Sequence, residues 1–91
     1  MNPREALAEL PDDPDAIADV MRGYGIKGRQ RDPDECVLAR YLRDAVGEPV
    51  LCGFSFASYG FRQPAVIPEN VSAFVERFDD GAYPDLIEDA A

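Results

Sequence analysis

Cys36 is the residue in this sequence whose position most favours chemical reactivity. It follows Asp32-Pro33-Asp34-Glu35, a typical helix start, so we expect it in the first turn of a helix. The helix dipole favours a thiolate there, and Arg40 and Arg43 follow one and two turns later. The acids directly before Cys36 oppose this effect. A small half-buried residue is the commoner interpretation, and a reactive thiol is the alternative.

Two glycine motifs resemble functional signatures without their structural context. Gly23-Tyr24-Gly25-Ile26-Lys27-Gly28 fits G-x-G-x-x-G, but it follows a predicted helix where a dinucleotide site needs a strand. Gly53-Phe54-Ser55-Phe56-Ala57 resembles a nucleophile elbow, but the chain has no histidine to complete a triad. The acids at 12–15 and 79–80 lack the central glycine and closing glutamate of a calcium loop. We therefore expect no catalytic residue, no cofactor and no metal.

The composition narrows the class of protein further. The 91 residues, 46% apolar and 30% charged, fit a single folded domain over residues 1–91 with one modest core. Eighteen acids against nine bases give a net charge of −9, which disfavours binding to nucleic acid and to membrane surfaces. The absence of histidine removes the base of Ser-His-Asp and Cys-His mechanisms. Two cysteines alone cannot complete a tetrahedral zinc site.

Location follows from apolar patterning. The sequence has no apolar run of membrane-spanning length, and its first residues, Met-Asn-Pro-Arg-Glu, do not read as a signal peptide. We therefore expect a cytoplasmic protein. Because the cytosol keeps thiols reduced, this location argues against a Cys36–Cys52 disulfide.

The charge is unevenly distributed along the chain. Residues 21–45 carry six bases and four acids, whereas the segments on either side are strongly acidic. The bases of this segment, 22–43, are Arg22, Lys27, Arg29, Arg31, Arg40 and Arg43. Their neighbouring acids favour an internally compensated surface, and a protein or nucleic-acid contact is the alternative.

Capping residues and apolar spacing predict four helices. They are expected to begin at Asn2-Pro3, Asp13-Pro14, Asp32-Pro33 and Pro68. The second and fourth carry apolar stripes at i, i+3, i+4 and i+7. These stripes are Ile17, Val20, Met21 and Tyr24, and Val71, Phe74, Val75 and Phe78. A final turn near Tyr83-Pro84-Asp85 is expected to bury Leu86 and Ile87.

The segment from Val50 to Ile67 changes to β-branched and aromatic residues. We predict a hairpin with strands near 50–56 and 61–67 and a turn at 57–60, with Pro64 confining the second strand to an edge. The fold class is therefore α+β, with three to four short helices packed on a β-hairpin. The order of three helices and a hairpin also resembles that of a winged helix.

The hairpin also supplies the candidate partner site. Its aromatic residues are Phe54, Phe56, Tyr59 and Phe61. Because they occur at both strand parities and no charge interrupts Val50 to Phe61, one sheet face is expected to leave an apolar patch. A kink at Gly53 or Gly60 would instead bury all four. The patch favours a protein partner or a homodimer.

Two segments resemble known sequences. They are Cys36-Val37-Leu38-Ala39-Arg40-Tyr41-Leu42-Arg43, a C-x-L-A-x-Y-L pattern, and Phe74 to Leu86, an F-V-x-x-F-D-x-G-x-Y-P-x-L pattern. Both are similar to segments of small proteins of high-GC Gram-positive bacteria and their phages. That group has no assigned activity, so the resemblance implies a cytoplasmic protein and no site residues.

The sequence thus predicts a non-catalytic, small acidic regulatory or adaptor protein that acts through protein contacts. The alternative is a winged-helix-like, nucleic-acid-binding regulator that uses the basic segment 22–43.

Overall fold

The computed structural model describes residues 2–53, 55–60 and 63–88. Within them the chain forms four α-helices, a three-stranded antiparallel sheet and one short 3-10 helix, which confirms the predicted α+β class. In chain order the elements are α1 (Pro3–Ala8), α2 (Pro14–Tyr24), α3 (Val37–Val46), β1 (Leu51–Cys52), β2 (Phe56–Ser58), β3 (Ala65–Val66), α4 (Glu69–Asp79) and η1 (Pro84–Leu86).

Most helix ends lie where the capping residues predict them. The Asn2 side chain accepts a hydrogen bond from the Glu5 backbone N–H at 2.9 Å and donates one to the Glu5 carboxylate at 2.8 Å, a reciprocal cap for α1. Gly25 and Gly47 end α2 and α3 with φ of +70° and +83°. Glycine favours this left-handed backbone because it has no Cβ to clash.

The start of α3 differs from the prediction. The helix begins at Val37 with Cys36 as its N-cap, and residues 33–36 form a separate turn. Asp32 organises that turn, since its Oδ1 accepts from the Asp34 and Glu35 backbone N–H groups at 3.1 and 3.2 Å. The Pro33 carbonyl accepts from Cys52 instead of a helical N–H, so tertiary pairing moves the helix start toward the C-terminus.

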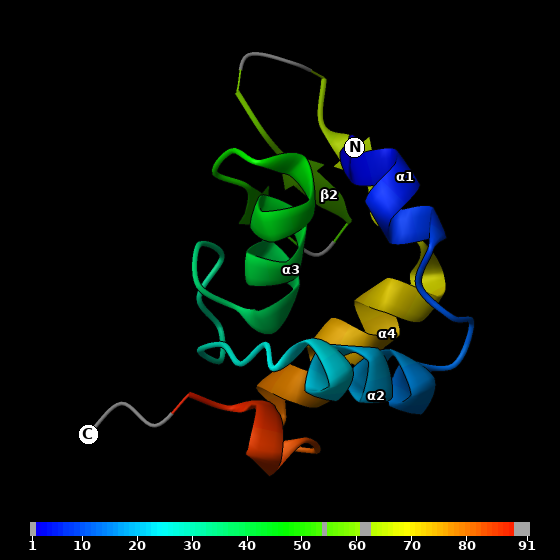
Figure 1. Cartoon of the computed structure of the whole chain (residues 1–91), viewed down its shortest axis with the longest axis vertical. Helices are drawn as coiled ribbons and strands as arrows, with labels where there is room; N and C mark the ends of the chain where they lie inside the picture. The colour runs from blue at the N-terminus through cyan, green and yellow to red at the C-terminus, as the bar shows by residue number, and fades with distance from the viewer. Residues whose placement is uncertain (1, 54, 61–62, 89–91) are drawn as a thin grey trace.

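Figure 1 shows the helices in two groups. α2 and α4 pack together at one end, while α1 packs against α3 at the other end, which also carries the sheet. The C-terminal segment returns to the loop after α2, where Gly28 and Ile87 form a parallel β-bridge. Gly28 is required there, because a Cβ would lie 2.2 Å from the backbone nitrogen of Val37.

The sheet has one strand more than the predicted hairpin. Leu51 pairs with Ser58 and Cys52 with Ala57, while Phe56 pairs with Val66 and Ala57 with Ala65. The expected turn at 57–60 is therefore wrong at Ala57 and Ser58, which belong to β2. The first turn comes earlier, where the Gly53 N–H donates to the Phe56 carbonyl at 2.9 Å. Pro64 precedes β3 and needs no ladder hydrogen bond.

The core lies between the helices and the inner face of the sheet. Ile17, Phe74 and Phe78 are 0% exposed, as the apolar stripes predict, and so are Leu38 and Leu42 of α3. Leu86 is buried and Ile87 partly buried, as expected for the final turn. The stripe of α2 is wrong at its last member, because Tyr24 is 68% exposed. It is the final residue of the helix, and its ring lies against Tyr41 with centroids 6.2 Å apart.

None of the helices in the described ranges has both the length and the apolar character that a bilayer crossing requires.

Candidate functional site

The outer face of the sheet carries three large apolar side chains. Leu51, Phe56 and Val66 are 49%, 53% and 62% exposed, whereas Cys52, Ala57 and Ala65 on the inner face are buried. Phe56 and Val66 are direct cross-strand partners, and Leu51 pairs with Ser58 on the strand that also carries Phe56. Side chains opposite one another in antiparallel strands are neighbours. These three residues therefore form one patch, which we call the apolar sheet face.

The predicted aromatic site maps only partly onto this face. Phe56 is exposed at its centre, and Tyr59 is half-buried and packs against the core. Phe54 and Phe61 lie outside the described residues. Sequence reasoning missed Leu51 and Val66 because it placed the turn at 57–60, which gave the strands the wrong register. The alternation of Leu51 with buried Cys52 is the signal that could have found one of them.

A cavity of about 410 Å³ lies beside this sheet, between the start of α3 and the end of α4. Its lining residues include both cysteines, Cys36 and Cys52, together with Arg31, Asp32, Pro33, Gly53, Val75, Glu76, Asp79 and Asp80. We call it the dithiol cavity. Across the described ranges, no three histidine, cysteine, aspartate or glutamate side chains are grouped so that they could hold a metal ion.

The side chains of the two cysteines in this cavity interact with each other. Both cysteines are free, with 4% and 7% exposure for Cys36 and Cys52. Cys36 Sγ also accepts from the Ala39 backbone N–H at 3.3 Å, as an N-cap should. The hydrogen bond from Cys52, helped by backbone N–H groups of Ala39 and Leu38, lowers the pKa of Cys36 against the opposing effect of burial. The same hydrogen bond, with burial, raises the pKa of Cys52.

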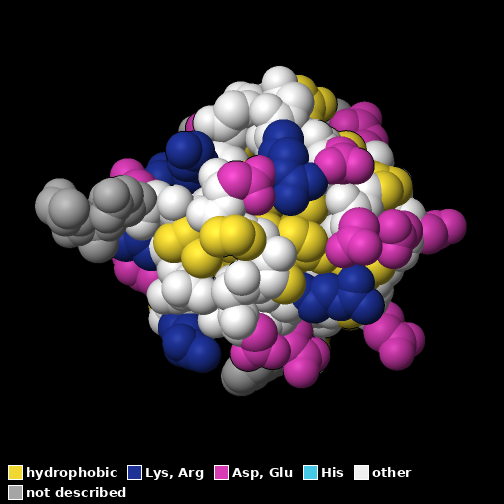
Figure 2. Space-filling view, turned by 90° about the horizontal axis from the view of Figure 1, so that it is seen from below, with side chains coloured by type: hydrophobic (Ala, Val, Ile, Leu, Met, Phe, Trp, Pro, Cys, Tyr) yellow, Lys and Arg dark blue, Asp and Glu magenta, His cyan; other side chains and the backbone are white. Residues whose placement is uncertain are grey.

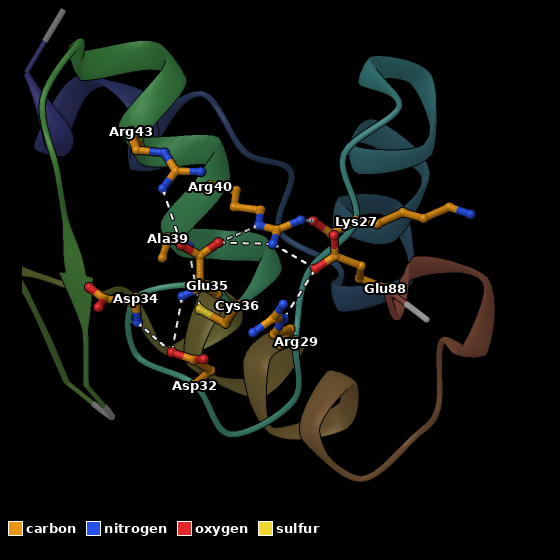
Figure 3. A network of polar contacts seen from close by, with 10 residues as sticks. All are labelled: Lys27, Arg29, Asp32, Asp34, Glu35, Cys36, Ala39, Arg40, Arg43 and Glu88. Atoms are coloured by element: carbon orange, nitrogen blue, oxygen red, sulfur yellow. Dashed lines mark hydrogen bonds and ion pairs between the residues drawn. The ribbon is translucent and has the colours of Figure 1, made fainter. Parts of the chain in front are cut away.

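The basic segment is largely neutralised by carboxylates, and Arg40 is its centre (Figure 3). The Arg40 guanidinium lies 2.8 Å from the Glu35 carboxylate and 2.7 Å from that of Glu88, and it donates to the Lys27 carbonyl at 2.9 Å. Arg29 contacts Glu88 at 3.3 Å and Arg43 contacts Glu35 at 3.5 Å. Two carboxylates are thus shared among three guanidinium groups.

The other bases of this segment lie apart from that cluster. Arg22 pairs with Asp19 at 2.6 Å and with Asp85. Figure 2 views the end of the molecule that carries α2 and α4, and there Lys and Arg side chains lie among Asp and Glu side chains. The Lys27 side chain points away from the Arg40 cluster in Figure 3, and Arg31 lines the dithiol cavity.

These ion pairs also hold the C-terminal segment. The hydrogen bond from Arg22 lowers the pKa of Asp85, and that from Arg40 lowers the pKa of Glu88. The Glu88 N–H donates to the Gly28 carbonyl at 2.7 Å and the Gly28 N–H donates to the Leu86 carbonyl at 2.9 Å. The charges of the basic segment therefore have a structural use, which is to anchor residues 84–88 on the helices.

The chain matches no protein-family model, no curated protein and no solved structure. The candidate sites therefore rest on geometry alone: the apolar sheet face, the dithiol cavity and the ion-paired basic segment.

Proposed function

We propose that this chain is a small acidic, non-catalytic regulatory or adaptor protein that binds a protein partner through the apolar sheet face. The observation that carries the proposal is the exposure of Leu51, Phe56 and Val66 on adjacent strands. Contiguous apolar patches on small proteins usually mark interaction surfaces. Aromatic residues at the centre of such patches supply much of the binding free energy. The absence of histidine from the whole chain further favours a binding role over a catalytic one.

The charge of the chain favours a basic partner over a second copy. Each copy carries a net charge of −9, so self-association brings together two strongly acidic surfaces. Acidic side chains also lie near the end of β1. Asp32, Glu76, Asp79 and Asp80 line the cavity that Cys52 and Gly53 share at the end of β1, with Arg31 as the opposing base. A partner with an apolar ridge flanked by lysine or arginine fits this surface.

The ion pairs of the basic segment favour a protein partner over nucleic acid. A phosphate group would have to displace Glu35 and Glu88 from Arg40, or Asp19 and Asp85 from Arg22. Counterion release then contributes less to binding, because the cations already have carboxylate partners. The proposed setting is the cytoplasm, where free thiols such as those of this chain are the rule.

The experiment is a comparison of three baits in extract of the native host: wild type, Phe56→Ser and Tyr24→Ser. Phe56 and Tyr24 are both exposed aromatic residues, 53% and 68%, but Tyr24 lies on α2 away from the sheet. We expect one basic protein to be retained by wild type and by Tyr24→Ser, and lost with Phe56→Ser. Loss of a central aromatic contact should weaken its binding by about 30-fold or more.

Light scattering on the isolated chain separates the alternatives. We expect light scattering to show a monomer at all concentrations. In the bait experiment, we expect retention of the partner to weaken as added salt screens the charges. A wild type that dimerises in a Phe56-dependent way would show that the face binds a second copy. The proposal would be contradicted if the retained protein bound wild type and Phe56→Ser equally well. Salt-sensitive binding to DNA that depends on Arg40 would also contradict it.

A further inference from the structure

The dithiol cavity brings together the only two cysteines of the 91-residue chain. Cys36 is the N-cap of α3 and Cys52 is the last residue of β1. A backbone hydrogen bond of 3.0 Å from the Cys52 N–H to the Pro33 carbonyl ties the strand to the turn that precedes Cys36. This bond lies on the outer edge of β1 and brings Cys52 close to Cys36, so that the two side chains interact.

The two sulfur atoms differ in their surroundings. Cys36 Sγ receives the Ala39 N–H at the start of a ten-residue helix, where the helix dipole also stabilises negative charge. Cys52 lies at the end of β1, where burial and the interaction with Cys36 raise its pKa. Cys36 is therefore the group that loses its proton first and acts as the nucleophile, while Cys52 keeps its proton and stabilises the Cys36 thiolate.

We propose that Cys36 and Cys52 form an oxidisable dithiol site that takes a small, neutral hydroperoxide and closes into an intramolecular disulfide. This inference is independent of the partner proposed for the apolar sheet face. It extends the sequence interpretation, in which Cys36 alone was the candidate reactive thiol and a Cys36–Cys52 disulfide was not expected.

The chemistry balances in two steps. The Cys36 thiolate attacks one peroxide oxygen, the O–O bond breaks, and the leaving alkoxide takes a proton to become an alcohol, or water from hydrogen peroxide. Cys36 is then a sulfenic acid. The Cys52 sulfur attacks the Cys36 sulfur, the S–O bond breaks, and the departing hydroxide takes the Cys52 proton and becomes water. Two thiols are oxidised by two electrons in total, and one peroxide is reduced.

The lining of the cavity favours a neutral oxidant. Its charged lining residues are four acids, Asp32, Glu76, Asp79 and Asp80, and one base, Arg31. An anionic oxidant such as glutathione disulfide is repelled by this lining, whereas a hydroperoxide carries no charge. The small exposure of both cysteines also favours a compact oxidant over a peptide disulfide.

The test uses the full reduced chain, treated with hydrogen peroxide, and measures intact mass after alkylation of free thiols. We expect wild type to lose two hydrogen masses and both alkylatable thiols, without forming covalent dimers. Cys52→Ser should stop at a Cys36 sulfenic acid that dimedone traps. Cys36→Ser should react at least about tenfold more slowly than wild type, because burial keeps the remaining Cys52 thiol protonated.

The variants replace each cysteine with a residue of similar size, so that local structure is disturbed as little as possible. Serine is a preferred N-cap, so Cys36→Ser keeps the start of α3. Circular dichroism checks the fold, and Cys52→Ala serves as a second variant that cannot close the disulfide. A parallel reaction with oxidised glutathione tests the charge argument, with slower thiol loss than with peroxide expected.

Three results would overturn the inference. The first is survival of both wild-type thiols under peroxide that oxidises a free-cysteine standard. The second is a Cys36 that is over-oxidised while Cys52 remains alkylatable, because the sulfur atoms then do not meet. The third is glutathione addition to Cys36 that is faster than disulfide closure by peroxide, which would contradict the neutral-oxidant assignment.

Discussion

Phe78 provides a direct test of how α4 packs into the core. Its side chain is 0% exposed in a helix that contacts α2. Truncation of a buried phenylalanine to alanine costs about 3–5 kcal/mol, from lost transfer free energy and from the cavity left behind. At about 0.05–0.15 kcal/mol per residue, a chain of 91 residues has roughly 5–14 kcal/mol of stability in total. Phe78→Ala therefore removes a large share of the free energy of unfolding.

The matched control is Phe56→Ala, the same substitution at a side chain that is 53% exposed. It should change the free energy of unfolding by only about 0.5 kcal/mol. Urea denaturation followed by far-ultraviolet circular dichroism suits this chain, which has no tryptophan. With a slope of about 1–2 kcal/mol/M, Phe78→Ala should lower the midpoint by about 1.5 M or more, or leave the chain unfolded without urea. Equal midpoints for the two variants would refute the packing of α4 described above.

Three further predictions concern the loop glycines, the C-terminal ion pairs and ligand binding. Gly28→Ala should destabilise the chain by roughly 1–3 kcal/mol, because its Cβ meets backbone atoms. Gly23→Ala in α2 has free space for its Cβ and should stabilise the chain by up to about 1 kcal/mol. Thermal unfolding of the two variants checks both expectations. The lowered pKa of Glu88 contributes stability that is complete above the ordinary carboxylate pKa of about 4 and is lost as the pH falls through the lower folded-state pKa. Across this pH range, the denaturation midpoint should therefore fall less steeply for Glu88→Gln than for wild type. Equal slopes would contradict the ion pair with Arg40. Calorimetry should give no more zinc, calcium or nicotinamide-cofactor binding than an unrelated acidic protein shows, and a saturable signal would contradict this expectation.

The helices were the most predictable part of the fold because their signals are local. Asn2 caps α1 through a residue three positions away, and Gly25 ends α2 through its own backbone conformation. The stripe of α4 needs only the helical period to place Phe74 and Phe78 inward. Such features depend on neighbouring residues alone, so the sequence carries them without reference to the rest of the chain.

The sheet was less predictable because its strands are two or three residues long. Alternation over so few residues cannot fix a register, and a shift of one residue exchanges the two faces. The register that places Leu51, Phe56 and Val66 outward is set by where the inner residues Cys52, Ala57 and Ala65 meet the core. The sequence therefore predicted the correct segment for the candidate partner site and its central residue Phe56, but not Leu51 and Val66.

The sequence by itself determined the α+β class, most helix ends and the inward residues of the helices, since these follow from periodicity and capping. Only the tertiary structure decided that Cys36 meets Cys52, that Glu88 returns to Arg40, and that the first turn of the predicted third helix unwinds. Each of these depends on residues far apart in the chain, and their pairing is chosen by the packing of the whole core. No local pattern encodes which distant partner a side chain will meet.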